Sequence, residues 1–271
     1  MHRHRSLAVL LCAAVLSSCN WFDDVGARDI TAPIPGSARI KFHNFSPSSV
    51  GVNFFANDQK MTAVQTSTCG SPTTAADSTA CASTGIESTT GTSYGGVAAG
   101  GRYDAIAPGQ YTLAAKVAAK PDVVSTLSQT IADGKYYSYF MSGVYSTTSK
   151  TAEAFVVEDP IPTGPADYTV AYVRLVNAVS DGTGPLTLYV TNAETKAETA
   201  IGSAVAYKAA GAFVAVPAGT YSLAVRYTGS ATNVISRTGL AFLGGRVYTV
   251  TARGSTATSS TLGLDFTENQ R

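Results

Sequence analysis

The chain has 271 residues, and its 19 basic and 18 acidic side chains give a formal net charge of +1. The basic residues are scattered rather than clustered, which argues against a nucleic-acid partner. Two of the three histidines lie in the first four residues, so His43 is the only histidine beyond them. A site that needs two histidines is therefore excluded from the body of the chain.

The N-terminus predicts export followed by lipid attachment. The stretch "MHRHR" is positively charged, "SLAVLLCAAV" is apolar, and "LSSC" places small residues before Cys19. The apolar run is about half as long as a bilayer-spanning helix requires. The segment resembles the signal of bacterial lipoproteins, which implies that residues 1–18 are removed and that Cys19 carries the acyl chains of a membrane anchor. An ordinary cleaved signal with an incidental cysteine is the alternative.

The expected location is the cell envelope. Asn20 follows the cysteine where enteric inner-membrane lipoproteins typically carry Asp, so we expect outer-membrane sorting if the organism has two membranes. Export also predicts the state of the remaining cysteines, because Cys12 leaves with the signal and an exported chain meets an oxidising environment. Cys69 and Cys81 are then expected to form one disulfide, contributing about 3 kcal/mol. A metal site on these two thiols is the rival, but no histidine or acidic cluster stands nearby to complete four ligands.

The most informative feature of the sequence is an internal repeat. Order and spacing are kept, apart from an insertion in the first copy that carries the two cysteines. The matching pairs are "RIKFHNFSPS" from Arg39 with "YVRLVNAVSD" from Tyr172, "YDAIAPGQYTL" from Tyr103 with "FVAVPAGTYSL" from Phe213, and "DGKYYSYFMSG" from Asp133 with "GGRVYTVTARG" from Gly244.

The repeat predicts the domain organisation. Three prolines in "EDPIPTGPAD" disfavour both helix and sheet pairing, which marks a linker between two domains that each bury their own core. The predicted segments are a signal peptide 1–18, a lipidated tether 19–36, a first domain 37–159 with a Ser/Thr-rich insert 58–93, a linker 160–166 and a second domain 167–271.

Alternation of apolar and polar residues predicts the fold class. Tyr221, Leu223 and Val225 alternate with polar or small residues, which is typical of strands with one buried face. Runs of this kind recur through both copies, separated by Gly, Pro, Asp and Asn, and no helical stripe of useful length is present. We therefore predict an all-β protein of two tandem immunoglobulin-like antiparallel β-sandwich domains.

Each copy carries a Gly-x-Tyr-x-apolar motif that enters one of these strands. The pairs are Gly109 with Tyr111 and Gly219 with Tyr221. Such a motif is typical of a tyrosine corner, in which the Tyr hydroxyl donates a hydrogen bond to backbone upstream. The alternative is that these tyrosines only fill the core.

The succession of "VRLVNAVSD", "TLYV", "VPAGTYSLAV" and "GGRVYTVTARG" resembles the bacterial domain of unknown function 4397 (DUF4397), which occurs in secreted and lipid-anchored proteins. The second copy is the closer match. The resemblance implies an immunoglobulin-like fold and a surface role without an established activity. Many members carry a histidine where Asn44 and Asn177 stand here, so histidine chemistry at that position is not expected.

Three short motifs resemble chemical sites, but their sequence context does not favour chemistry. "GTSYG" around Ser93 matches a nucleophile elbow, but it lies in a Ser/Thr/Gly-rich insert and no histidine follows it. His43 alternates with apolar neighbours, so we expect it on the opposite face of an early strand and partly exposed. Asp181 in "SDGTG" could offer oxygen to calcium, although a plain turn is favoured. We predict no catalytic residue, no metal and no cofactor.

The aromatic run "KYYSYFMSGVY" is the best candidate contact surface. Strand alternation directs Tyr137, Tyr139 and Met141 to the core, and Tyr136 and Phe140 outward, where they could contact a ligand. The insert or the other domain could equally cover them. The sequence therefore favours a noncatalytic, lipid-anchored envelope module with a role as a spacer, in adhesion or in binding envelope polysaccharide or protein. An envelope enzyme with an unrecognised site and a subunit of an envelope complex are the alternatives.

Overall fold

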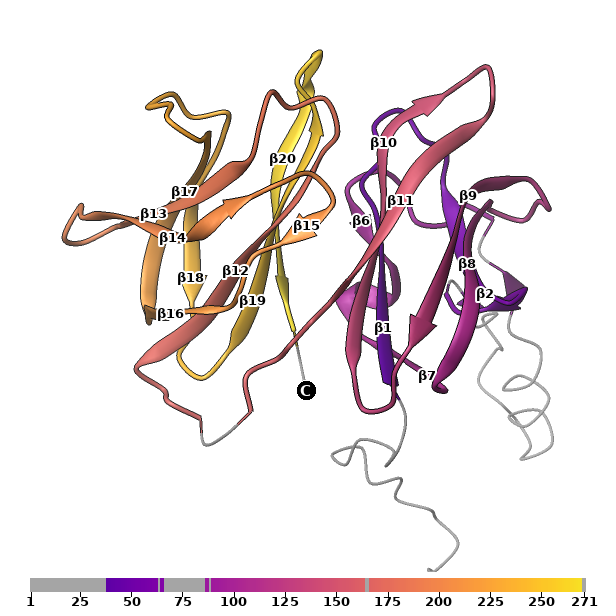
Figure 1. Ribbon diagram of the computed structural model, residues 1–271, viewed down its shortest axis with the longest axis horizontal. Helices are drawn as coiled ribbons and strands as arrows, with labels where there is room; N and C mark the ends of the chain where they lie inside the picture. Colours follow the sequence, from indigo (N-terminus) through magenta and orange to yellow (C-terminus); the bar gives the residue numbers. More distant parts are fainter. Residues whose placement is uncertain (1–37, 63, 66–85, 88, 164–165, 270–271) are drawn as a thin grey trace, which may run out of the picture. The chain divides into compact units, whose positions relative to one another are not determined.

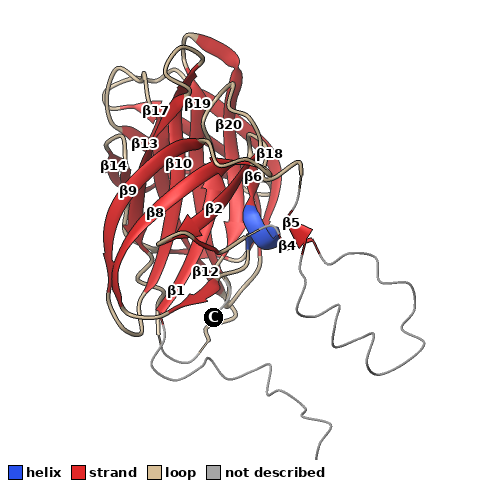
Figure 2. Cartoon of the chain, turned by 90° about the vertical axis from the view of Figure 1, so that its right-hand side faces the viewer, coloured by secondary structure: helices blue, strands red, loops and turns tan. Residues whose placement is uncertain are grey.

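The computed structural model describes residues 38–62, 64–65, 86–87, 89–163 and 166–269, all within one compact unit, Gly36–Arg271. The regular structure of these residues is β-strand, apart from one short helical turn at Ala98–Gly101 (η2) (Figure 2). The predicted all-β class is confirmed. Cys19, Cys69 and Cys81 lie outside the described residues.

The first half forms a sandwich of two sheets. One sheet has the order β11-β10-β1-β6, with β7 also paired to β1, and the other has the order β3-β2-β8-β9. A separate two-stranded sheet, β4-β5, lies within the insert. The strands are Ala38–Asn44 (β1), Val52–Ala56 (β2), Gln59–Lys60 (β3), Val64–Gln65 (β4), Ile86–Glu87 (β5), Gly96–Val97 (β6), Asp104–Ile106 (β7), Gly109–Val117 (β8), Val123–Ile131 (β9), Tyr136–Ser146 (β10) and Thr151–Glu158 (β11).

The second half repeats this order strand for strand. One sheet is β15-β12-β19-β20, with β16 also paired to β12, and the other is β14-β13-β17-β18. The strands are Val170–Val179 (β12), Leu186–Asn192 (β13), Glu198–Val205 (β14), Ala209–Ala210 (β15), Val214–Pro217 (β16), Gly219–Tyr227 (β17), Ile235–Phe242 (β18), Val247–Ser255 (β19) and Thr258–Glu268 (β20).

One pairing in each sandwich differs from the predicted antiparallel arrangement. The first strand of each half runs parallel to the second-last strand of the same half, β1 beside β10 and β12 beside β19. A parallel neighbour needs a long crossover, and here the whole second sheet supplies it. Alternation within a strand reports its buried face but not the direction of its neighbour, so the sequence did not reveal this pairing.

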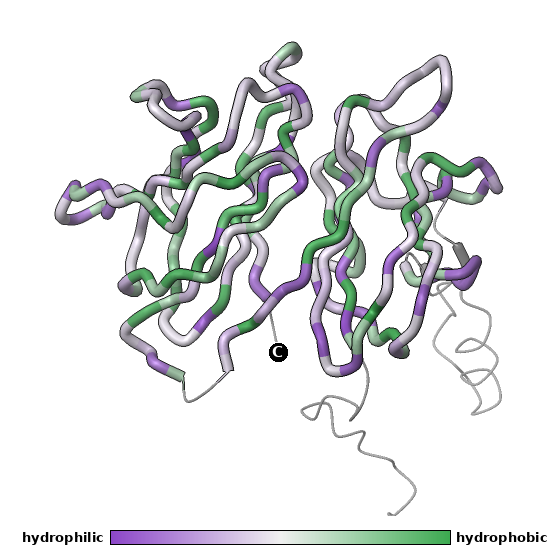
Figure 3. The backbone as a smooth tube through the Cα atoms, viewed as in Figure 1, coloured by the Kyte–Doolittle hydropathy of each residue, from purple (hydrophilic) through white to green (hydrophobic). Residues whose placement is uncertain are grey.

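Each sandwich has its own hydrophobic core. Hydrophobic and hydrophilic residues are interspersed along the strands (Figure 3). Successive side chains of a strand face opposite sides of its sheet, and the inward ones form the two cores. The predicted inward set of the run after Lys135 is confirmed, since Tyr137, Tyr139 and Met141 all belong to the first core. Leu223 and Val225 are buried in the second core as predicted.

A third hydrophobic cluster lies between the two sandwiches. It joins Phe45, Phe140 and Phe155 of the first half to Val176 and Ala178 of the second. The sheet containing β10 therefore packs on the sheet containing β12 and β19 (Figure 1). The two halves are coupled by a buried interface as well as by the proline-rich segment after Glu158.

The tyrosine corner is formed in the second sandwich. The Tyr221 hydroxyl donates a hydrogen bond of 2.9 Å to the Pro217 carbonyl, and the ring is buried. Gly109 in the first sandwich has a φ of 151°, a backbone conformation that favours glycine, and it lies beside the Tyr111 ring. Within the described part of the chain, however, the Tyr111 hydroxyl makes no such hydrogen bond. The first copy thus matches the alternative that its tyrosine only fills space beside the core.

Candidate functional site

Two buried cations mark the interface between the sandwiches. Lys41 on β1 and Arg174 on β12 occupy equivalent repeat positions, and alternation turns both away from their own cores. Both side chains are almost completely buried, at 1% exposure each. A buried charge is costly unless it is paired and hydrogen-bonded, so the partners of these two cations decide whether the interface can form.

Lys41 reaches across to the end of the second sandwich. Its ammonium donates to the Asn269 side-chain oxygen at 3.0 Å and to the Glu268 carbonyl at 3.2 Å, and it lies 4.3 Å from the centre of the Tyr103 ring. Burial lowers the pKa of Lys41 to about 8, against the opposing attraction of Asp159. At neutral pH the side chain is therefore still a cation.

Arg174 makes the reverse contact to the end of the first sandwich. Its guanidinium forms an ion pair with Asp159 and donates to the Glu158 carbonyl at 3.0 Å. It also lies 4.6 Å from the centre of the Phe213 ring. Each copy therefore uses the cation of its first strand to bind the residues that follow the last strand of the other copy.

These contacts are related by the repeat, residue for residue. We call them the interface clasp: Lys41, Tyr103 and Asn269 on one side, and Arg174, Phe213 and Asp159 on the other. Both sides have a cation, an aromatic face beneath it and a polar acceptor just after the last strand. Such reciprocity is the property of an isologous interface, in which one surface pairs with its own copy.

One sequence prediction about this face is wrong, and one alternative that the sequence left open is decided. His43 is not partly exposed: it is 2% exposed, donates from Nδ1 to the Tyr139 carbonyl at 3.1 Å, and stacks on Phe140 with ring centres 4.3 Å apart. Burial, followed by repulsion from Lys41, lowers its pKa to about 3. Phe140 points away from its own core as predicted, but the second sandwich covers it completely, so no ligand reaches it in this arrangement.

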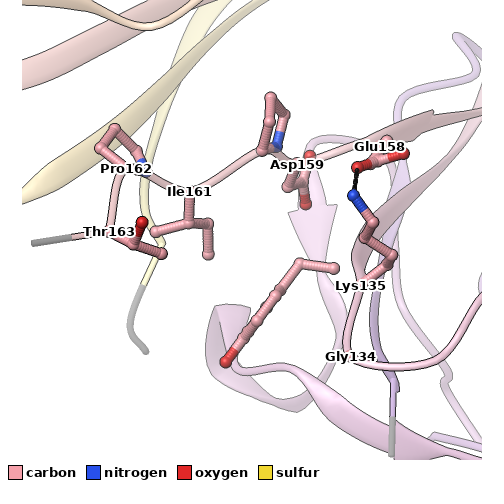
Figure 4. A pocket seen from close by; sticks show the side chains of 9 residues that line it. Gly134, Lys135, Glu158, Asp159, Ile161, Pro162 and Thr163 are labelled. Atoms are coloured by element: carbon pink, nitrogen blue, oxygen red, sulfur yellow. Dashed lines mark hydrogen bonds and ion pairs between the residues drawn. The ribbon is translucent and has the colours of Figure 1, made fainter.

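Tyr136, the other predicted contact residue, lines an open cleft at the start of the linker. We call this the linker cleft; its volume is about 410 Å³. In Figure 4 the Lys135 ammonium meets the Glu158 carboxylate, while Ile161 and Thr163 belong to the linker segment that borders the space. The lining residues are Gly134, Lys135, Tyr136, Glu158, Asp159, Pro160, Ile161, Pro162 and Thr163.

The linker cleft is connected to the interface clasp through aromatic contacts. The Tyr136 ring meets the Tyr103 ring edge to face, with centres 5.1 Å apart. The Tyr103 hydroxyl in turn donates to Asp159 at 2.6 Å. The clasp therefore supports one wall of the cleft, and Tyr136 is half-buried in that wall. An aromatic face beside an ion pair suits a ligand with an apolar face and polar edges.

The other two candidate residues, Asp181 and Ser93, have structural roles, and among the described residues they form no binding or catalytic site. Asp181 accepts hydrogen bonds from Ser255 Oγ and from the backbone of Thr256 and Ala257 at 2.7 to 2.9 Å. Burial alone would raise its pKa, but these hydrogen bonds lower it to about 2. The carboxylate therefore caps a turn, as the plain-turn reading favoured. Ser93 precedes a turn instead of a helix, so the elbow geometry is not formed.

Asn44 and Asn177, at the position where family members carry histidine, have equivalent roles in the two copies. The Asn44 side chain donates to the Thr92 carbonyl at 2.8 Å and accepts from Ser49 Oγ at 2.9 Å. Asn177 donates to the Val205 carbonyl and accepts from the Val179 amide, both at 3.0 Å. Both therefore fasten the end of the first strand to a neighbouring segment, and an amide supplies the donor and acceptor required.

The clasp was missed by the sequence reasoning, although a signal for it was present. The repeat aligned Lys41 with Arg174, and a cation inside an otherwise apolar strand at the same place in both copies indicates a partner on the outward face. The described residues contain no group of three or more metal-binding side chains. Nor does any described helix have the length and hydrophobicity to span a bilayer.

Comparison with known proteins gives a family match in the second half of the chain. The model of a family described as "Domain of unknown function (DUF4397)" matches residues 171–271, which confirms the predicted family there. No curated protein matches the chain. Among solved structures, CBMbc, a family CBM26 protein from Eubacterium rectale Amy13K in complex with maltoheptaose, is similar over 87% of this chain and 97% of its own, at 12% identity. The TM-score is 0.23, which is too low to support an argument.

Proposed function

We propose that this chain, whose second half belongs to the DUF4397 family, is a noncatalytic, lipid-anchored protein of the cell envelope that binds a glycan in the linker cleft. The anchor is Cys19, after removal of residues 1–18. The observation that carries the binding role is the linker cleft itself, which is lined both by Tyr136 and by the Lys135–Glu158 ion pair.

The chemistry of the linker cleft favours a sugar over an apolar ligand. A pyranose ring has apolar C–H faces that suit an aromatic ring and a rim of hydroxyls that suit charged and backbone groups. The cleft supplies the ring from Tyr136, a donor from Lys135 and an acceptor from Glu158. The ion pair is exposed, so it can exchange one of its hydrogen bonds for a hydroxyl at little cost.

The histidine and the two carboxylates described above do not favour catalysis. The only histidine there is sealed between the sandwiches and neutral at physiological pH. The carboxylates of Asp159 and Asp181 are occupied by the clasp and by a turn, respectively. A binding module needs none of these groups to be free.

The binding role is tested with polysaccharide extracted by hot aqueous phenol from the envelope of cells that make the protein. We expect the mature chain to bind this extract, and Tyr136→Ala to weaken binding at least tenfold. Tyr189→Ala is the matched control, because Tyr189 lies under Arg226 and lines no part of the linker cleft. Equal binding by the wild type and Tyr136→Ala would contradict the assignment, and binding abolished by protease treatment of the extract would indicate a protein partner instead.

The anchor is tested separately by replacing Cys19 with Ala. We expect this variant to leave the membrane fraction in a high-salt wash, because the acyl chains are the only anchor that the sequence predicts. Retention of the variant would contradict the lipoprotein assignment without affecting the glycan assignment.

A further inference from the structure

The linker cleft has a counterpart at the same end of the second sandwich. This second cleft has a volume of about 300 Å³ and is bordered by the turn between β18 and β19 and by the end of β20. The repeat relates it to the linker cleft, which is bordered by the turn between β9 and β10 and by the end of β11. Its lining residues are Ala166, Tyr168, Gly244, Gly245, Arg246, Val247, Glu268 and Asn269.

The polar groups of the two clefts are equivalent. Arg246 pairs with Glu268 at 2.7 Å, as Lys135 pairs with Glu158 at 2.9 Å. Asn269 stands where Asp159 stands in the linker cleft, and both are bound by the clasp cation of the opposite copy. Both clefts therefore offer one cation and one carboxylate at the mouth.

The aromatic ring of the second cleft comes from a different place in the chain. Position 247, equivalent to Tyr136, is a buried valine, and Tyr168 from the segment before β12 supplies the ring instead. Its side chain is 78% exposed, the highest value among the large hydrophobic residues described. The ring lies over Gly245, and an added Cβ on Gly244 would come within 1.7 Å of the Tyr168 carbonyl oxygen. The glycine pair thus seats this tyrosine at the cleft.

We propose that the second cleft is a second glycan subsite, and that the chain binds one repeating polysaccharide through both clefts together. This proposal rests on the proposed function of the linker cleft. A polymer presents the same unit many times, so two equivalent sites suit it better than they suit a single protein epitope. Both turns and the linker lie at the same end of the described unit, where one extended chain can reach both clefts (Figure 1).

The interface clasp makes the two subsites act as a pair. Lys41 and Arg174 tie each sandwich to the last residues of the other, and those residues, Asn269 and Asp159, are themselves part of the two cleft walls. A fixed relation between sites converts the second binding event into an intramolecular one, which raises the affinity for a ligand long enough to span them. Short fragments gain nothing from this arrangement.

The test compares long and short chains of the phenol-extracted polysaccharide by titration calorimetry with the full mature protein. We expect one long chain per protein, two short fragments per protein, and at least tenfold tighter binding of the long chains. Tyr168→Ala should remove this length advantage and one of the two short-fragment sites. Tyr136→Ala should do the same, and Tyr189→Ala should change neither.

The outcomes separate this inference from the function on which it rests. Wild-type binding of one short fragment per protein, lost in Tyr136→Ala and unchanged in Tyr168→Ala, overturns the second subsite and leaves the linker cleft intact. Absence of any binding by the wild type overturns both. Each variant's circular dichroism spectrum and urea midpoint are recorded alongside, so that a loss of binding is credited only to a folded protein.

Discussion

The two sandwiches share one strand order but complete it with different side chains. The cation of the second copy is an arginine that meets a carboxylate, whereas the cation of the first is a lysine that meets an amide. The tyrosine corner is hydrogen-bonded in the second copy and has no equivalent bond in the first. The comparison teaches that the topology tolerates wide changes in side chains as long as each buried cation keeps a polar partner.

Among the differences between the copies, the Arg174–Asp159 ion pair should have the largest effect on stability when it is changed. Replacing Asp159 with Asn leaves Arg174 buried without a counter-charge, and we expect the free energy of unfolding to fall by about 3 kcal/mol. Urea denaturation followed by circular dichroism measures the change. Asn269→Ala, which removes a neutral partner of Lys41, should cost less.

Exchanging the two acceptors tests whether the clasp is truly reciprocal. In the double variant Asp159→Asn with Asn269→Asp, the single carboxylate moves from Arg174 to Lys41. If the two sides are equivalent, the double variant regains more than half of the stability lost by Asp159→Asn alone. A double variant as unstable as the single one would show that only the arginine side can hold a carboxylate.

The fold was largely predictable, because burial leaves a clear pattern in the sequence. The alternation around Tyr139 and around Leu223 identified the core faces correctly, and the repeat predicted which strands correspond. The site was only partly predictable. Alternation turns Tyr136 and Phe140 away from the core, but it leaves open whether a ligand or the other domain meets them. Tyr136 lies in a cleft, whereas Phe140 lies under the second sandwich.

The sequence could not predict that Phe140 and His43 are buried between the sandwiches, and the reason is physical. Alternation reports that Phe140 and His43 face away from their own core, but it cannot report whether solvent or another domain lies on that side. Packing between two domains depends on a whole surface, and its buried residues are spread over β10, β11, β12 and the residue that follows β1. Tyr168 was missed for a different reason, since it belongs to no strand and shows no periodicity.

The turn cap at Asp181 offers a pH-dependent contrast between the copies. The equivalent residue in the first copy is Ser48, which has no carboxylate to ionise. Because the pKa of Asp181 is held at about 2, below its ordinary value of 3.8, the cap contributes fully above pH 4 and is lost as the pH falls from 4 to 2. The group is mostly exposed, so after allowing for solvent screening we expect Asp181→Asn to cost about 1 kcal/mol at pH 5.

Urea midpoints of the wild type and Asp181→Asn at pH 5 and at pH 3 check this expectation. The gap between the two proteins should narrow at the lower pH, where the wild-type carboxylate begins to take up a proton. A gap that stays constant would mean that Asp181 acts through its shape alone.

The two corner tyrosines allow a matched pair of substitutions. Tyr221→Phe removes a hydroxyl that donates to the Pro217 carbonyl, and we expect a loss of roughly 0.7 kcal/mol. Tyr111→Phe removes a hydroxyl without such a bond, so its unfolding free energy should stay within about 0.3 kcal/mol of the wild type. Equal losses in both variants would show that the first copy also forms a closed corner in solution.

The smallest expected effect comes from a position where the copies differ inside the interface. Phe140 of the first copy corresponds to Thr251 of the second, which lies beside Val176 on the face that packs against the first sandwich. The Thr251 hydroxyl is buried and has no hydrogen-bond partner among the described residues. An unpaired buried hydroxyl costs free energy that a methyl group does not, so Thr251→Val should stabilise the protein by about 0.5 kcal/mol. Thermal denaturation at a fixed protein concentration should show a small rise in the Tm of Thr251→Val, with Thr249→Val as the control. Because Thr249 accepts a hydrogen bond from Arg174 at 3.1 Å, that control should lower the Tm instead, and a fall in both variants would mean that Thr251 has a polar partner at the interface in solution.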